Sequence, residues 1–83
     1  MHFVLYRGHL EPIEVTELKE YLASIYGDYL QDAYLRALHS RNPLRTFIRL
    51  LSQRHKMDMF TLRVAVAYFE YMYRGTLRAI VFE

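Results

Sequence analysis

The chain has 83 residues, a net charge of +2 and no cysteine, and its composition is 53% apolar and 16% aromatic. A chain of this length forms one domain, so we expect residues 1–83 to share one small core. The lack of cysteine excludes disulfides and thiolate metal sites. The first residues lack the basic leader of a signal peptide. The longest apolar run, over 64–69, is far shorter than the ~20 residues of a membrane span. These two features predict a soluble cytoplasmic protein.

Both ends of the chain predict short strands. Residues 2–7 (HFVLYR) are rich in β-forming side chains and stop at Gly8, and residues 76–82 (TLRAIVF) have the same character. Because a lone strand leaves its backbone groups unpaired, we expect the two strands to pair, either within a chain or between chains.

Two helices are predicted in the first half of the chain. Pro12 begins the first helix, which is expected to end near Gly27. Asp28 then follows as the cap of the second helix, with Gln31 three residues later as its capping-box partner.

Two further helices have clearer boundary signals. Asn42 caps the third helix and Pro43 occupies its first turn, while Asp58 caps a fourth helix that runs to about Arg74, before Gly75. The expected fold is a compact bundle of four short helices with terminal strands, in the order β-α-α-α-α-β. This fold is mainly α, or α+β if the strands pair.

Positive charge is concentrated in one segment. Residues 1–40 sum to −3, residues 41–57 to +5 and residues 58–83 to zero, and no acidic residue lies between positions 33 and 57. Arg41, Arg45 and Arg49 recur at the four-residue step that aligns side chains on one helix face. We predict that this surface binds the carboxylates or phosphates of a partner. The predicted binding residues are Arg41, Arg45, Arg49, Arg54, Lys56 and Arg63.

The fourth helix is apolar on almost every side, which is typical of a helix that is covered all round. We assign the face that contains Phe69 to the chain's own core. A second face then remains for another molecule, and aromatic side chains often anchor such interfaces. We therefore predict a homodimer through this second face, which consists of Phe60, Val64, Tyr68 and Tyr71.

The pair of helices over 43–74 is also compatible with a helix-turn-helix, whose second helix would enter the major groove of DNA. The side chains that would then face DNA include one base-reading donor, Arg63. Binding to DNA or RNA phosphates is therefore the alternative to a protein partner.

Catalytic patterns are scarce. Arg49 and His55, in the segment RLLSQRH, are spaced in a way that resembles the Arg and His pair of the helical nucleotide-binding ribonucleases known as HEPN domains. This resemblance covers seven residues, and it implies that Arg49 would steady a phosphate and His55 would transfer a proton. Leu50 stands where that family usually has a polar residue. Because no other nucleophile, phosphate loop or ligand set is found, we expect no enzymatic activity, no cofactor and no metal.

Taken together, these patterns predict a small non-enzymatic regulatory or adaptor protein. Its Arg-rich third helix is expected to dock an acidic protein surface, and its aromatic fourth helix to form a homodimer. Phosphate contacts by the same arginines are the competing hypothesis.

Overall fold

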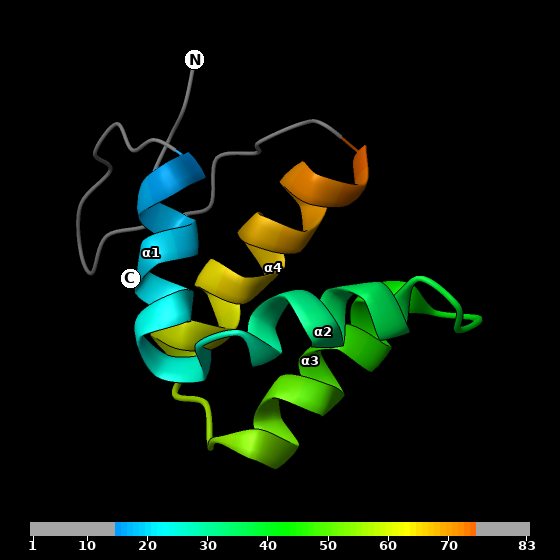
Figure 1. The fold of residues 1–83 in the computed structure, drawn as a ribbon, viewed down its shortest axis with the longest axis horizontal. Coiled ribbons are helices and arrows are strands. Elements are labelled where there is room, and N and C mark those ends of the chain that lie inside the picture. The colour runs from blue at the N-terminus through cyan, green and yellow to red at the C-terminus, as the bar shows by residue number, and fades with distance from the viewer. Residues whose placement is uncertain (1–14, 75–83) are drawn as a thin grey trace.

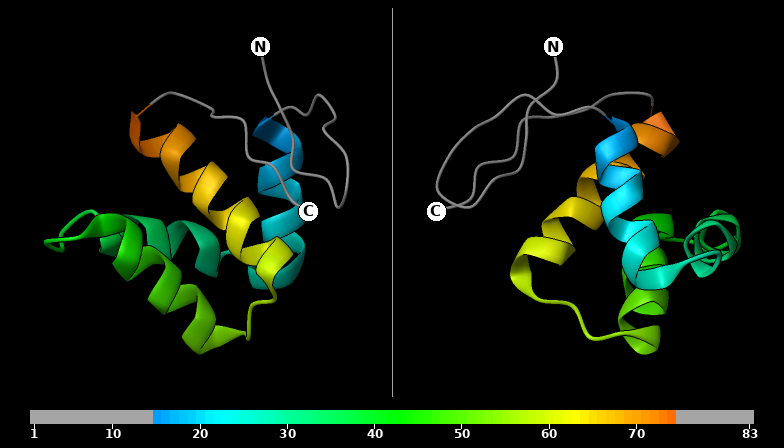
Figure 2. Two further views of the ribbon diagram at one scale, coloured as in Figure 1. Left: turned by 180° about the vertical axis from the view of Figure 1, so that it is seen from behind. Right: turned by 60° about the vertical axis from the view of Figure 1, so that its left-hand side comes forward.

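The computed structural model describes residues 15–74, which form four α-helices and no strand (Figure 1). The helices are α1 (Val15–Tyr26), α2 (Tyr29–Ala37), α3 (Pro43–Arg54) and α4 (Met59–Arg74). α1 packs against α4, α2 packs against α3, and α3 also contacts α4, as the two views in Figure 2 show. The described part of the fold is therefore all-α, and the strands predicted over 2–7 and 76–82 lie outside it. None of the described helices has the length and apolar character needed to cross a membrane.

The turn between α1 and α2 is made by a glycine. Gly27 has a φ of 59°, in the left-handed region that glycine adopts most easily, and its N–H donates to the Ala23 carbonyl oxygen at 2.8 Å. This confirms the predicted end of the first helix. The predicted capping box is wrong, because Asp28 already has helical backbone angles and its side chain makes no capping hydrogen bond, so Gln31 has no such partner.

Side-chain caps begin α3 and α4, as predicted. Asn42 Oδ1 accepts a hydrogen bond from the Arg45 backbone N–H at 3.2 Å, and Pro43 is the first helical residue of α3. Asp58 Oδ1 accepts from the Thr61 backbone N–H at 2.7 Å at the start of α4. Each cap pairs a backbone donor that the first turn of a helix leaves without a partner.

Removing the α3 cap is expected to destabilise the protein measurably. Asn42→Ala should lower the free energy of unfolding by about 1 kcal/mol, because the Arg45 N–H loses its acceptor. The matched control is Asn42→Ser, which keeps an oxygen at the cap and should stay close to wild type. Urea denaturation measures both variants, and equal losses would contradict the assigned role of the Asn42 side chain.

The core is centred on aromatic rings from three helices. Phe47 of α3 is fully buried, and its ring centroid lies 5.3 Å from that of Phe69 and 6.3 Å from that of Tyr68, both on α4. Tyr34 of α2 packs edge-on against Phe47 at 6.2 Å. α1 contributes aliphatic side chains such as Leu22, which is fully buried. One cluster therefore joins all four helices.

Tyrosine hydroxyls link the helices by hydrogen bonds. Tyr21 Oη of α1 and Thr61 Oγ1 of α4 lie 2.8 Å apart. Tyr26 Oη donates to the His55 carbonyl oxygen at 3.2 Å, which connects α1 to the end of α3. Rings that pack against the core thus keep their polar ends paired, as buried polar groups require.

Alkaline pH is expected to destabilise the fold. Burial raises the pKa of Tyr26, Tyr34 and Tyr68 above the ordinary value of 10.0. The folded state therefore keeps these protons at pH values where the unfolded chain loses them, and the free energy of unfolding falls as the pH rises above about 10. Denaturation followed by circular dichroism at increasing pH measures this, and Tyr68→Phe should reduce the decline. A stability that stays constant or rises over this range would contradict the prediction.

Candidate functional site

The predicted basic surface lies on the outer side of α3. Arg45 and Arg49 are one turn apart and exposed, because Phe47 and Leu51 hold the opposite side of the helix in the core. Arg41 is also exposed, but it lies in the bend before α3, which corrects the prediction that all three arginines share one helix face. We call Arg41, Arg45 and Arg49 the arginine ridge.

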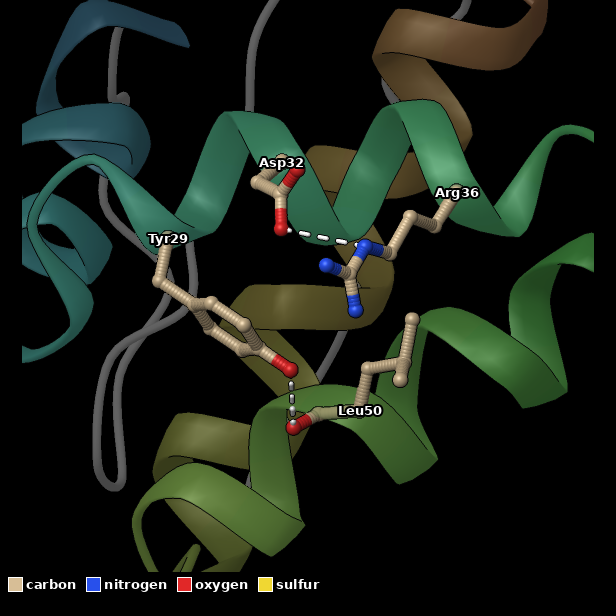
Figure 3. Close-up of polar contacts among 4 residues, drawn as sticks. All are labelled: Tyr29, Asp32, Arg36 and Leu50. Atoms are coloured by element: carbon tan, nitrogen blue, oxygen red, sulfur yellow. Dashed lines mark hydrogen bonds and ion pairs between the residues drawn. The ribbon is translucent and has the colours of Figure 1, made fainter.

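Three other predicted binding residues lie beyond this ridge. Arg54 and Lys56, at the end of α3 and in the linker to α4, are exposed, whereas Arg63 on α4 is half-buried and therefore the least accessible. The Arg54 guanidinium carbon lies 4.8 Å from the centre of the Tyr29 ring, in a cation–π contact. Tyr29 Oη also donates to the Leu50 carbonyl oxygen at 3.4 Å (Figure 3). Tyr29 of α2 thus supports the C-terminal half of α3.

Two of the described acidic side chains form ion pairs with arginines outside the ridge. Asp32 on α2 forms an ion pair with Arg36 on the same helix, at 3.1 Å (Figure 3). Glu70 forms a similar pair with Arg74 on α4, at 3.2 Å. Within the part of the chain that the structure describes, the arginine ridge forms no ion pair. Its three positive charges are therefore exposed without an acidic counterpart from residues 15–74.

Two of the four residues of the predicted self-association face of α4 are buried in the chain's own core, which corrects the prediction that they face outwards. Val64 and Tyr68 are only 2% and 3% exposed, because α1 and α3 both pack against α4 and bury these side chains within one chain. Phe60 and Tyr71 are half-buried, and the Phe60 ring packs edge-on against Tyr21 with centroids 5.5 Å apart. The apolar side chains that α4 does expose are Met59, Met72 and Tyr73.

The same burial limits the helix-turn-helix hypothesis. α3 and α4 do pack together as a helical hairpin. Of the side chains that an inserted α4 would present to a DNA groove, however, Val64 and Ala67 are both 2% exposed. Contacts with nucleic acid would therefore depend on the arginine ridge and phosphates rather than on base reading by α4.

Arg49 and His55 do not lie in an enclosed site. His55 follows the last residue of α3, its Nδ1 lies 3.1 Å from the Lys56 carbonyl oxygen, and its ring packs edge-on against Tyr26 at 6.2 Å. Both side chains are exposed. The described part of the chain contains a cavity of about 520 Å³ among α1, α2 and α4, and neither Arg49 nor His55 lines it. Among the described residues, no group of three or more His, Cys, Asp or Glu side chains could hold a metal ion.

Sequence reasoning missed that cavity, which is an open groove. Its lining includes Tyr34 and Leu35 of α2, Tyr68 and Met72 of α4, and Lys19 of α1. The signal in the sequence was weak, because Leu35 and Met72 look like ordinary apolar residues beside the core positions of their helices. That the two helices border one groove depends on tertiary packing.

No family model matches the chain, and neither curated proteins nor solved structures provide a match. What the surface can bind therefore follows from its chemistry. Guanidinium groups form forked hydrogen bonds with carboxylates and phosphates. The arginine ridge can thus bind an anionic surface.

Proposed function

We propose that the protein is a small non-enzymatic adaptor or regulatory protein whose arginine ridge docks an acidic surface of a protein partner. The observation that carries this proposal is the exposure of Arg41, Arg45 and Arg49 without ion pairs inside residues 15–74. Arginine is enriched at interface positions that contribute strongly to binding, and its forked geometry suits carboxylates.

The packing of α3 supports a pre-organised docking surface. Phe47 and Leu51 fix one side of the helix in the core, and Tyr29 contacts its C-terminal half. A fixed helix backbone loses little further freedom on binding, which favours affinity.

The spacing on α3 also suggests the form of the acidic surface. Arg45 and Arg49 are one helical turn apart, with Cβ atoms roughly 6 Å from each other. Carboxylates at a four-residue step on a partner helix have the same spacing. We therefore propose an acidic helix as the preferred target.

Nucleic acid is the second candidate, because phosphates fit the same guanidinium groups. Such binding would be non-specific in sequence, since α4 is covered by its own chain. Three phosphate contacts would give a logarithmic salt slope of about −2.7 in a mobility-shift titration.

Affinity capture from an extract of the native host, with and without nuclease, separates the two candidates. The proposed function predicts an acidic protein that is retained after nuclease treatment. Capture that disappears with nuclease, together with a salt-dependent mobility shift on duplex DNA or RNA, would instead favour the phosphate-binding alternative.

A further inference from the structure

The groove among α1, α2 and α4 contains apolar side chains that remain exposed among the described residues 15–74. Leu35 of α2 and Met72 of α4, at 50% and 45% exposed, line it together with Tyr34 and Tyr68. Tyr73, half exposed, follows directly after Met72. Exposed apolar residues that cluster around a groove are typical of an interaction surface.

The charges that line the groove are of opposite sign. Lys19 of α1 and Asp28 of the turn after α1 both line it, and both are exposed. They are nine positions apart in sequence, with Lys19 on α1 and Asp28 two residues after the end of that helix. Neither forms an ion pair with another residue in the described part of the chain, and Asp28 makes no capping hydrogen bond.

We infer that a second copy of this chain occupies the groove and forms a two-fold symmetric dimer. A two-fold axis between Lys19 and Asp28 places Lys19 of each copy against Asp28 of the other, so the same ion pair forms twice. Ala23, which is exposed and also lines the groove, lies between the two charges and allows close approach of the second α1. The groove surface of one copy is thus complementary in charge to the same surface of a second copy.

The arginine ridge could not serve as this interface, because two copies of it would repel each other. α3 lies below α2 in Figure 1, whereas the groove is bordered by α1, α2 and α4. A dimer through the groove therefore leaves both ridges accessible. Two ridges in one assembly would also raise the apparent affinity for a target that presents two acidic surfaces.

Complementary charge reversals test the inference. Lys19→Glu creates two like-charge contacts in its own dimer, and Asp28→Lys does the same with the opposite sign. In a mixture of these two variants, both contacts are attractive again. Sedimentation equilibrium from about 1 to about 500 μM measures association, in which wild type should move from 10.0 kDa towards twice that mass.

Each variant alone should dimerise about tenfold more weakly than wild type, and the equimolar mixture should recover to within about threefold. Glu20→Lys is the matched control, because Glu20 is exposed on α1 beside Lys19 but does not line the groove, and it should associate like wild type. Leu35→Lys, at an exposed apolar position, should also weaken association without loss of circular dichroism signal. A wild type that stays monomeric throughout the series, or a mixture no tighter than either variant alone, would overturn the inference.

Discussion

Phe47→Ala is expected to lower the free energy of unfolding by about 3 to 5 kcal/mol, because the ring is fully buried and its loss leaves a cavity at the centre of the core. The rings of Tyr34, Tyr68 and Phe69 surround Phe47, so three of the four helices lose contacts together. Proteins are generally stable by only about 5 to 15 kcal/mol, so this substitution should remove a large fraction of the stability.

Urea denaturation followed by circular dichroism measures this loss. The matched control is Met59→Ala, since Met59 is apolar but 62% exposed, and its change should stay within about 0.5 kcal/mol. Similar losses for the two variants would contradict the description of Phe47 as the centre of the core.

Reversal of the arginine ridge is expected to abolish binding to the acidic partner while leaving the fold intact. The triple substitution of Arg41, Arg45 and Arg49 by Glu should reduce affinity by at least about 100-fold, because three attractive contacts become repulsive. All three side chains are exposed, so the free energy of unfolding should change little. Quantitative mass spectrometry of proteins captured by the two forms measures the effect.

The corresponding triple substitution by Lys is the matched control for charge alone. Lysine keeps the positive charge but cannot form the forked hydrogen bonds of arginine. Carboxylate recognition therefore predicts an intermediate loss of about tenfold for the Lys variant. Nearly unchanged binding of the Lys variant would show that positive charge alone is sufficient and would contradict recognition through forked hydrogen bonds.

Local sequence signals predicted much of the described fold. Gly27, Asn42 and Asp58 mark helix boundaries through backbone conformation and capping hydrogen bonds, which depend on a few neighbouring residues. The core side of α3 was also predictable, because Phe47 and Leu51 alternate with charged residues at the helical period. The capping box at Asp28 failed because Asp28 already has helical backbone angles directly after Gly27.

The orientation of α4 could not be predicted in the same way. A helix that is apolar on nearly every side has no strong preference in sequence for which side is buried. Val64 and Tyr68 were assigned outwards, but packing against both α1 and α3 turns them into the core. The groove beside Met72 was missed for a related reason, because it depends on how α2 and α4 are placed by the rest of the fold.

We propose above all that the arginine ridge is a binding surface for an acidic protein. It is tested most directly by calorimetric titration of the purified, nuclease-treated partner into wild type and into the triple Glu variant of Arg41, Arg45 and Arg49. We expect saturable binding to wild type, weakened by added salt, and no detectable binding to the variant at the same concentrations. Equal affinity for the two forms would contradict it.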